Sequence, residues 1–364
     1  MADIASRVWL GVTLVLIAVV SLVVNIIVIV VWVKTQKLRD PKYYFWINLV
    51  VVDIIGICMW TSLSVTAVVG DAWILPDVVC NVHAYFSTFC NVINLHTLTI
   101  LALERFLKFF KPSKHEDICI GFFLILLICG VWFFDGVVCV FTAIHWAQVR
   151  YYQAQYQCIP EHQLSTSHLN FMFILSYGVP LVVMVATYTA CFIKVIHMRS
   201  RVQPKGALVL ETNKSAKGDS YSERMKRYTD KFQNAGMKNK KPKLEKTYDY
   251  TKDGYVVKSD TEDDVQPSDT KSRFKKKEYS LAKEDYMLLK VYVITSCAYV
   301  GTWIPYVISS YVWTYSRFSP LPAGVITSLV WLSHCGAFVK PLVYGLCFEK
   351  FRSRLLTVLR RQET

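Results

Sequence analysis

Long apolar stretches alternate with short polar ones along most of this chain. An apolar helix needs about 20 residues to cross a hydrocarbon core of roughly 30 Å, and seven runs of that length are present. They lie at 8–33, 45–69, 79–106, 118–144, 171–196, 288–313 and 323–346. The pattern predicts an all-α membrane protein built as a bundle of seven transmembrane helices, with the lipid bilayer as its surroundings.

Basic residues are distributed unevenly over the segments between these runs. Lysine and arginine gather after the first, third and seventh runs, whereas the alternate segments are nearly neutral. Because cytoplasmic loops carry the excess of basic residues, we expect the N-terminus outside the cell and the C-terminus inside. The first run is long enough to span a membrane and lacks a small-residue cleavage pattern, which favours a helix over a cleaved signal.

One connection is far longer than the others. Between residues 194 and 283 it holds 23 basic and 13 acidic residues and little apolar periodicity, which predicts disorder. After the last run, Phe348, Phe351, Leu355 and Leu359 recur at helical spacing, which predicts an amphipathic helix on the inner leaflet. The predicted organisation is an outer N-terminus at 1–7, helices one to five at 8–199, a disordered basic third cytoplasmic loop at 200–280, helices six and seven at 281–346, and the eighth helix with a short tail at 347–364.

Composition agrees with this organisation. The chain of 364 residues is 53% hydrophobic, with a mean hydropathy of +0.32. Its net charge of +14 comes largely from the long loop, where basic residues support topology and attract anionic lipids. Because no folded basic domain with interleaved aromatic residues accompanies this charge, we expect no nucleic-acid partner.

The polar residues inside the runs follow a specific order. Each is costly in a membrane unless it has a partner or a function. The segment from Asn48 to Asp53 is similar to an NLxxAD motif, and Glu104 with Arg105 is similar to a (D/E)R(Y/F) motif. Further matching positions are Asn25, Trp132, Pro180, Tyr188, Trp303, Pro305, Pro341 and Tyr344. Together these motifs resemble the rhodopsin-like G-protein-coupled receptors, in an orphan-like subgroup, over nearly the whole chain outside the long loop.

The resemblance implies a function and a set of partners. We expect a plasma-membrane receptor that passes a conformational signal to a heterotrimeric G protein and catalyses no bond formation, with no cofactor and no metal. Arrestin and kinases are further expected partners through the third cytoplasmic loop, where Thr261 precedes three acidic residues; a solvated linker is the simpler interpretation. The resemblance also implies a disulfide between Cys80 and Cys158 on the oxidising side.

The same resemblance assigns an activation switch. Arg105 needs an anion, and its pairing with Asp285 beside Glu104 would hold helix six inward. Pro305 removes a backbone hydrogen bond and allows helix six to bend while Trp303 repacks above it. Tyr188 and Tyr344, beside Pro341, are expected to meet near the released arginine in the active form.

Lys340 departs from the family pattern, because asparagine or aspartate normally precedes the proline of helix seven. In the family this position faces the aspartate of helix two across a pocket that often holds sodium. We expect Lys340 to pair with Asp53, near Asn25, and to replace the ion. The alternative is that Lys340 extends to the cytosol while Asp53 is protonated.

A second acid, Asp135, lies within the fourth run, with His96 as its candidate partner and a structural role preferred over ligand binding. Asp53, Asp135 and Lys340 also suggest an alternative function, a seven-helix transporter or ion-conducting protein. The sequence shows no repeated halves or broken helices, which are common in transporters, and no catalytic motif.

Two positions limit the ligand. Ser87 stands where aminergic receptors carry aspartate, so we expect a non-aminergic receptor. His334 stands where visual pigments carry the lysine that binds retinal. The predicted cavity is lined by Ser87, Asn91, Trp303, Tyr306, Ser310 and His334. This neutral, aromatic set suits a small uncharged or lipid-like ligand, or none. The alternatives left open are that these residues only pack the core and that the receptor is constitutively active.

Overall fold

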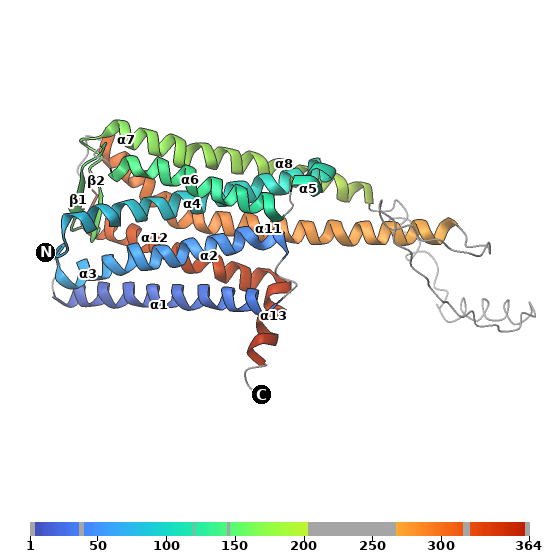
Figure 1. The fold of residues 1–364 in the computed structure, drawn as a ribbon, viewed down its shortest axis with the longest axis horizontal. Coiled ribbons are helices and arrows are strands. Elements are labelled where there is room, and N and C mark those ends of the chain that lie inside the picture. Colours follow the sequence, from blue (N-terminus) through green and yellow to red (C-terminus); the bar gives the residue numbers. More distant parts are fainter. Residues whose placement is uncertain are drawn as a thin grey trace, which may run out of the picture. The chain divides into compact units, whose positions relative to one another are not determined.

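The computed structural model describes residues 4–35, 40–118, 121–143, 146–202, 267–315 and 321–360. Within these ranges seven helices or helix series are long and apolar enough to cross a membrane, which confirms the predicted bundle (Figure 1). They are α1 (Ile4–Lys34); α2 (Tyr44–Gly56) with η3 (Ile57–Thr61) and α3 (Ser62–Gly70); α4 (Asp77–Phe110); α6 (Gly121–Ala143); α7 (Thr166–Phe171) with η4 (Met172–Gly178) and α8 (Val179–Val202); α11 (Pro267–Tyr315); and α12 (Ala323–Cys347).

Short elements mark the two ends of the bundle. A hairpin of β1 (Val149–Tyr152) and β2 (Gln157–Pro160) is antiparallel, with Tyr151 opposite Cys158. We call this the hairpin end. The helices η2 (Pro41–Tyr43), α5 (Pro112–Ile118) and α13 (Glu349–Arg360) lie at the other end, which we call the Arg105 end (Figure 1). In α13, Phe351 is buried and the neighbouring arginine at 352 is exposed, as an amphipathic helix requires.

The described chain forms two units. The first contains Met1–Ile196 and Glu284–Thr364, and the second contains His197–Lys283, with the last residues of α8 and the first of α11. Helix α11 begins at Pro267, well before the predicted start near 288, because its first turns are rich in lysine and arginine, which have good helix propensity. The described part of the predicted loop is therefore helical. The rest, including Thr261, lies outside the described residues.

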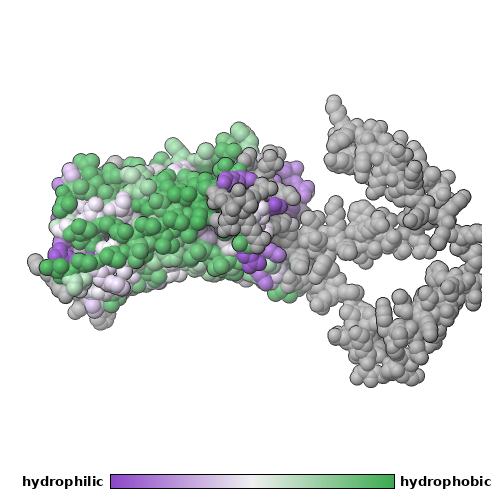
Figure 2. All heavy atoms as spheres, turned by 90° about the horizontal axis from the view of Figure 1, so that it is seen from below, coloured by the Kyte–Doolittle hydropathy of each residue, from purple (hydrophilic) through white to green (hydrophobic). Residues whose placement is uncertain are grey.

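The surface and the interior of the bundle reverse the usual distribution of polar groups. Hydrophobic residues cover the flank of the bundle in Figure 2, and Phe122, Phe133 and Val182 are each at least 70% exposed. Polar side chains are instead buried, among them Arg105 and Lys340. This is the distribution that a hydrocarbon solvent favours.

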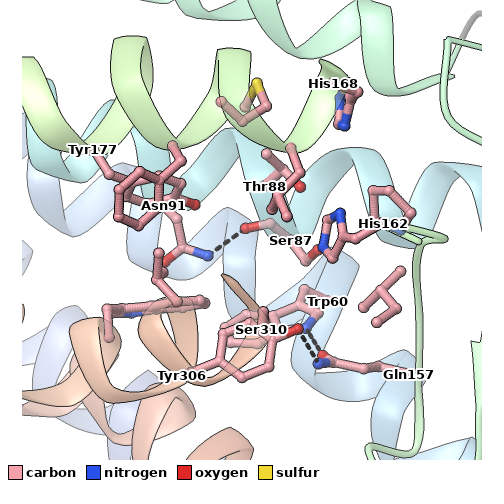
Figure 3. A pocket seen from close by; sticks show the side chains of 17 residues that line it. Trp60, Ser87, Thr88, Asn91, Gln157, His162, His168, Tyr177, Tyr306 and Ser310 are labelled. Carbon is pink, nitrogen blue, oxygen red and sulfur yellow. Dashed lines mark hydrogen bonds between the residues drawn. The ribbon is translucent and has the colours of Figure 1, made fainter. Parts of the chain in front are cut away.

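Two π-helical segments shape the interior near the hairpin end. Segment η3 interrupts the second span, and η4 interrupts the fifth just before Pro180. Proline lacks a backbone N–H and disturbs the helix before it, and π turns are frequent at functional sites. As a result Trp60 of η3 and Tyr177 of η4 are both directed toward one pocket (Figure 3).

Candidate functional site

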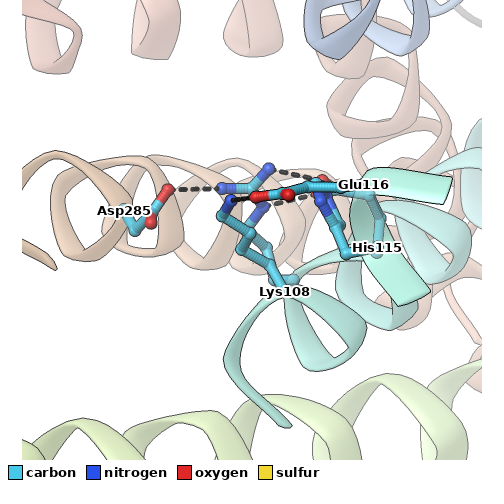
Figure 4. A network of polar contacts seen from close by, with 6 residues as sticks. Lys108, His115, Glu116 and Asp285 are labelled. Atoms are coloured by element: carbon cyan, nitrogen blue, oxygen red, sulfur yellow. Dashed lines mark hydrogen bonds and ion pairs between the residues drawn. The ribbon is translucent and has the colours of Figure 1, made fainter. Parts of the chain in front are cut away.

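A cluster of charged residues surrounds Arg105 where α4 approaches the Arg105 end. The Arg105 side chain is 3% exposed, and its guanidinium donates to both oxygens of Glu104 and lies 3.4 Å from Asp285 Oδ1 on α11 (Figure 4). It also lies 5.3 Å from the centre of the Tyr292 ring, a cation–π distance. The structure therefore brings together the arginine and both acids that the sequence suggested.

His115 of α5 joins this cluster, which sequence reasoning missed. Its Nε2 contacts Glu104 Oε1, and Lys108 lies 4.0 Å from Glu116 on the same short helix (Figure 4). Glu104 is thus held from α5 as well as by Arg105. The sequence motif around Arg105 did not indicate this contact, because it depends on how α5 packs against α4, which the local pattern does not reveal.

The two tyrosines of the predicted switch are not joined to each other. Tyr188 forms a hydrogen bond of 3.1 Å with Ser296 on α11. Tyr344 is buried and stacks on Trp46, with ring centres 4.5 Å apart. This arrangement combines a closed Arg105–Asp285 contact with separated tyrosines.

At mid-bundle, Lys340 and Asp53 form a fully enclosed pair. Lys340 Nζ lies 2.8 Å from Asp53 Oδ1, and their side chains are 1% and 4% exposed. The ammonium also donates to the carbonyl of Gly336 at 3.2 Å and lies 4.5 Å from the centre of the Tyr299 ring, while Asn94 donates to Asp53 Oδ1 at 3.1 Å. A cavity of about 20 Å³ remains beside them, enough for about one water molecule.

Asn25 is not bonded to this pair, although it was predicted to lie beside it. Its amide donates to the carbonyl oxygens of Ser21 and Ala337, at 2.8 and 2.9 Å. It therefore ties α1 to α12 one turn away from the lysine. Burial of a polar amide requires such partners, and backbone carbonyls supply them here.

Trp303 and Pro305 lie on α11 between the polar core and the hairpin end. The Trp303 ring centre is 5.2 Å from that of Trp60, and Pro305 lies inside the helix. A Cβ added at Gly336 would come within 3.1 Å of Trp303 Nε1. The absence of a side chain at Gly336 therefore lets the indole pack directly against α12.

A pocket lies between η3, α4, η4, α11 and the hairpin (Figure 3). Its volume is about 80 Å³, well below the usual range for ligand pockets of about 300–1,000 Å³. Five of the six predicted residues line it: Ser87, Asn91, Trp303, Tyr306 and Ser310. None of the described residues that line it is an aspartate, glutamate, lysine or arginine.

His334, the sixth predicted residue, does not line this pocket. Its ring stacks on Trp60 with centres 3.8 Å apart, and its Nδ1 bonds Thr61 Oγ1 at 3.0 Å. The π turn at η3 explains the difference, because it carries Trp60 between His334 and the cavity. The histidine supports a pocket wall rather than forming one.

Glutamines of the hairpin close the pocket, and sequence reasoning missed them too. Gln155 accepts a hydrogen bond of 2.9 Å from the hydroxyl of Tyr306, and Gln157 accepts one of 3.1 Å from the indole of Trp60. His162 also lines the pocket from the segment after the hairpin, where burial and, to a lesser extent, His168 lower its pKa to about 4. His162 is therefore neutral near pH 7, and the closed pocket remains uncharged.

A disulfide joins Cys80 at the start of α4 to Cys158 of β2, with Cα atoms 5.4 Å apart. The predicted pairing is confirmed. The bond fixes the hairpin over the pocket, so that the glutamines of the turn and of β2 reach the bundle.

Comparison with known proteins decides the family. A family model described as "7 transmembrane receptor (rhodopsin family)" matches residues 24–344. The chain belongs to this family. The family resemblance read from the motifs is thereby confirmed, and Arg105, Asp53 and Pro341 all lie inside the matched range.

Relatives of this rhodopsin-family receptor span several kinds of receptor. It is 19% identical to 5-hydroxytryptamine receptor 7 of Xenopus laevis, over 99% of this chain and 78% of that protein. It is 21% identical to melatonin receptor type 1A of Mus musculus and 24% identical to the blue-sensitive opsin of Anolis carolinensis, covering about half of each chain. The crystal structure of squid rhodopsin matches with a TM-score of 0.75 at 15% identity, over 100% of this chain and 88% of that one.

The family also bears on the two functions that the sequence left open. These relatives are receptors, and a rhodopsin-family bundle that crosses the membrane several times does not favour the transporter alternative. The spread of relatives over serotonin, melatonin and opsin proteins points to no single ligand.

Proposed function

We propose that this rhodopsin-family protein is a plasma-membrane receptor that transmits a conformational signal from the pocket to a heterotrimeric G protein. The hairpin end faces outward, and the Arg105 end meets the G protein. The observation that carries the proposal is that α11 contributes to both places. Trp303 and Tyr306 reach the pocket, and Asp285 reaches Arg105.

A single helix, α11, joins the pocket to the Arg105 end. Asp285 and Tyr306 are 21 residues apart in one helix, about 31 Å at 1.5 Å per residue. Pro305 lies beside the pocket contacts and lacks the N–H that would stiffen the helix there. A ligand that binds the open form better than the closed form therefore shifts the Arg105 contact at the far end.

The ligand that this pocket favours is uncharged. An ammonium ligand finds no carboxylate among the described lining residues, and Ser87 occupies the position where an amine receptor carries one. The similarity to a serotonin receptor therefore extends to the bundle and not to an amine site. A ligand must also displace the hairpin glutamines or aromatic rings, because the closed pocket is too small for one; without such a ligand, basal activity sets the output.

The Lys340–Asp53 pair sets the resting state without sodium. A tethered ammonium occupies the place between α2 and α12 where relatives often hold the ion, and its three contacts leave room for no hydrated cation. The receptor's balance between closed and open forms therefore depends on an internal charge rather than on the ionic medium.

Second-messenger output in cells tests this function directly. Wild type, Arg105→Ala and Lys340→Asn are expressed to equal surface levels, without added ligand, and cyclic AMP, calcium and inositol phosphate are recorded. Output from wild type that disappears with Arg105→Ala supports coupling. Measurable output from wild type that is equally strong with Arg105→Ala overturns it, whereas silence in every variant is what a ligand-dependent receptor gives. An N-terminal epitope tag that antibody cannot reach on intact cells overturns the orientation.

A further inference from the structure

A second, larger hollow lies on the side of the bundle between α4 and α6, away from the pocket described above. It is about 340 Å³ in volume and is lined by His96, Thr99, Leu126, Gly130, Phe134 and Asp135, among others. Leu126 and Phe134 are each about half exposed, as expected of residues that face acyl chains. The hollow opens toward lipid and shares no lining residue with the closed pocket.

One carboxyl oxygen in this hollow lacks a hydrogen-bond partner among the described residues. Asp135 is 0% exposed, and its Oδ1 lies 2.6 Å from Nδ1 of His96. Its Oδ2 has no hydrogen-bond partner among the described residues. The nearby hydroxyl of Thr99 has a single hydrogen, which it directs to the backbone carbonyl of Leu95 at 2.9 Å, with that of Pro180 at 3.5 Å.

An unpaired carboxyl oxygen is especially unfavourable here, because hydrocarbon offers no water in its place. Acyl chains can cover Leu126 and Phe134 but cannot bond Oδ2. Oδ2 accepts a hydrogen bond and needs a donor whether His96 or Asp135 holds the proton that Nδ1 and Oδ1 share. A hydroxyl group serves in both cases, whereas an anionic fatty acid is repelled by the ionised carboxylate.

The depth of the acid excludes ordinary lipid headgroups. Asp135 lies eight residues before the end of α6 at Ala143, about 12 Å below that end at 1.5 Å per residue. A molecule that reaches it must be dissolved in the hydrocarbon. Gly130 leaves space for such a molecule, because a Cβ added there meets nothing within 4 Å.

From these contacts we infer that the hollow between α4 and α6 is a binding site for an uncharged, membrane-dissolved alcohol, whose hydroxyl bonds Asp135 while its hydrocarbon part lies over Gly130. The His96–Asp135 pair then has a role beyond holding two helices together. The inference does not depend on G-protein coupling.

Photolabelling of the full chain tests the site. The purified protein is placed in phosphatidylcholine nanodiscs with a dodecanol that carries a diazirine, and labelled peptides are identified by mass spectrometry. Label is expected on α4 and α6. Unlabelled dodecanol is expected to reduce it about fivefold more than dodecane at the same membrane mole fraction, which is the effect of about one hydrogen bond.

Two glycine variants provide a matched pair. Gly130→Phe fills the hollow and is expected to abolish the label, whereas Gly301→Phe, at an exposed position on α11 that is equally open, is expected to leave it unchanged. Equal competition by dodecane and dodecanol overturns the inference, as does unchanged labelling in Gly130→Phe or label spread evenly over all lipid-facing helices. The competition arm uses wild type alone, so it decides the matter even where Gly130→Phe does not fold.

Discussion

Two buried ion pairs in this receptor have similar chemistry and different surroundings. In the polar core, Lys340 and Asp53 are 1% and 4% exposed, and the ammonium has a carboxylate, a carbonyl and an aromatic ring around it. At the Arg105 end, Arg105 is 3% exposed but Asp285 is 25% exposed, at the longer distance of 3.4 Å. Solvent water can replace the partly exposed Asp285, whereas it does not reach the buried Asp53. We therefore expect the core pair to stay closed and the end pair to open and close.

The largest effect is expected from removing the core cation alone. Lys340→Met should lower the free energy of unfolding by about 3–5 kcal/mol, because it leaves a buried carboxylate without its partner. Thermal unfolding of purified protein measures this. Lys290→Met, at an exposed position on α11, is the control and should change little.

Restoring neutrality should recover much of that loss. In Lys340→Met combined with Asp53→Asn, the destabilisation should be smaller than the sum of the two single effects. Strict additivity would show that the two residues are not coupled and that the core pair is no part of the fold's stability.

The next effect concerns the response of the Lys340–Asp53 pair to sodium. Wild-type unfolding temperature should be the same in sodium and in choline chloride, because the ammonium fills the site. Lys340→Asn removes the tethered charge and should gain about 1–3 kcal/mol of stability at saturating sodium. A sodium-dependent shift in wild type, or none in Lys340→Asn, would contradict the idea of a tethered ion.

A smaller effect is expected at the Arg105 end. Asp285→Asn should weaken the closed form by about 1 kcal/mol and raise ligand-free output roughly fivefold, with little change in unfolding temperature. The neighbouring variant Glu284→Gln is the matched control, measured in the same second-messenger assay. A large loss of stability in Asp285→Asn would remove the contrast between the two pairs.

The smallest effect is expected from removing the contact between His115 of α5 and Glu104. His115→Ala removes one of the groups that hold Glu104 but leaves Arg105 in place, so basal output should rise by about twofold or less. His115→Gln should retain most of the contact. If His115→Ala raises output more than Asp285→Asn does, α5 rather than α11 is the main restraint on Arg105.

Much of the fold followed from the sequence because membrane constraints are strong. Seven apolar runs of sufficient length allow few alternatives, and each intramembrane charge had to find a partner. Lys340 and Asp53 could be paired for that reason, as could His96 and Asp135. The early start of α11 at Pro267 could not be predicted, because charged helices lack the apolar periodicity that marks a span.

Contacts between distant segments were harder to foresee. The π turn at η3 moved Trp60 in front of His334, and no local pattern in the sequence marks such a turn. Gln157 lines the pocket and Gln155 bonds Tyr306 of its wall because the disulfide at Cys158 anchors their hairpin over the bundle. Asn25 found backbone partners instead of charged ones, which side-chain types alone do not reveal.

The buried lysine also has a consequence for how the protein is made. A lysine in a transmembrane segment opposes insertion by up to about 3 kcal/mol, and the hydropathy of α12 is the lowest of the seven spans, at 1.3. The acid that neutralises it lies on α2, which leaves the ribosome long before α12 does. Stable integration of the last span therefore depends on a helix already in the bilayer, and biogenesis of this receptor ends with an ion pair that joins its second span to its seventh.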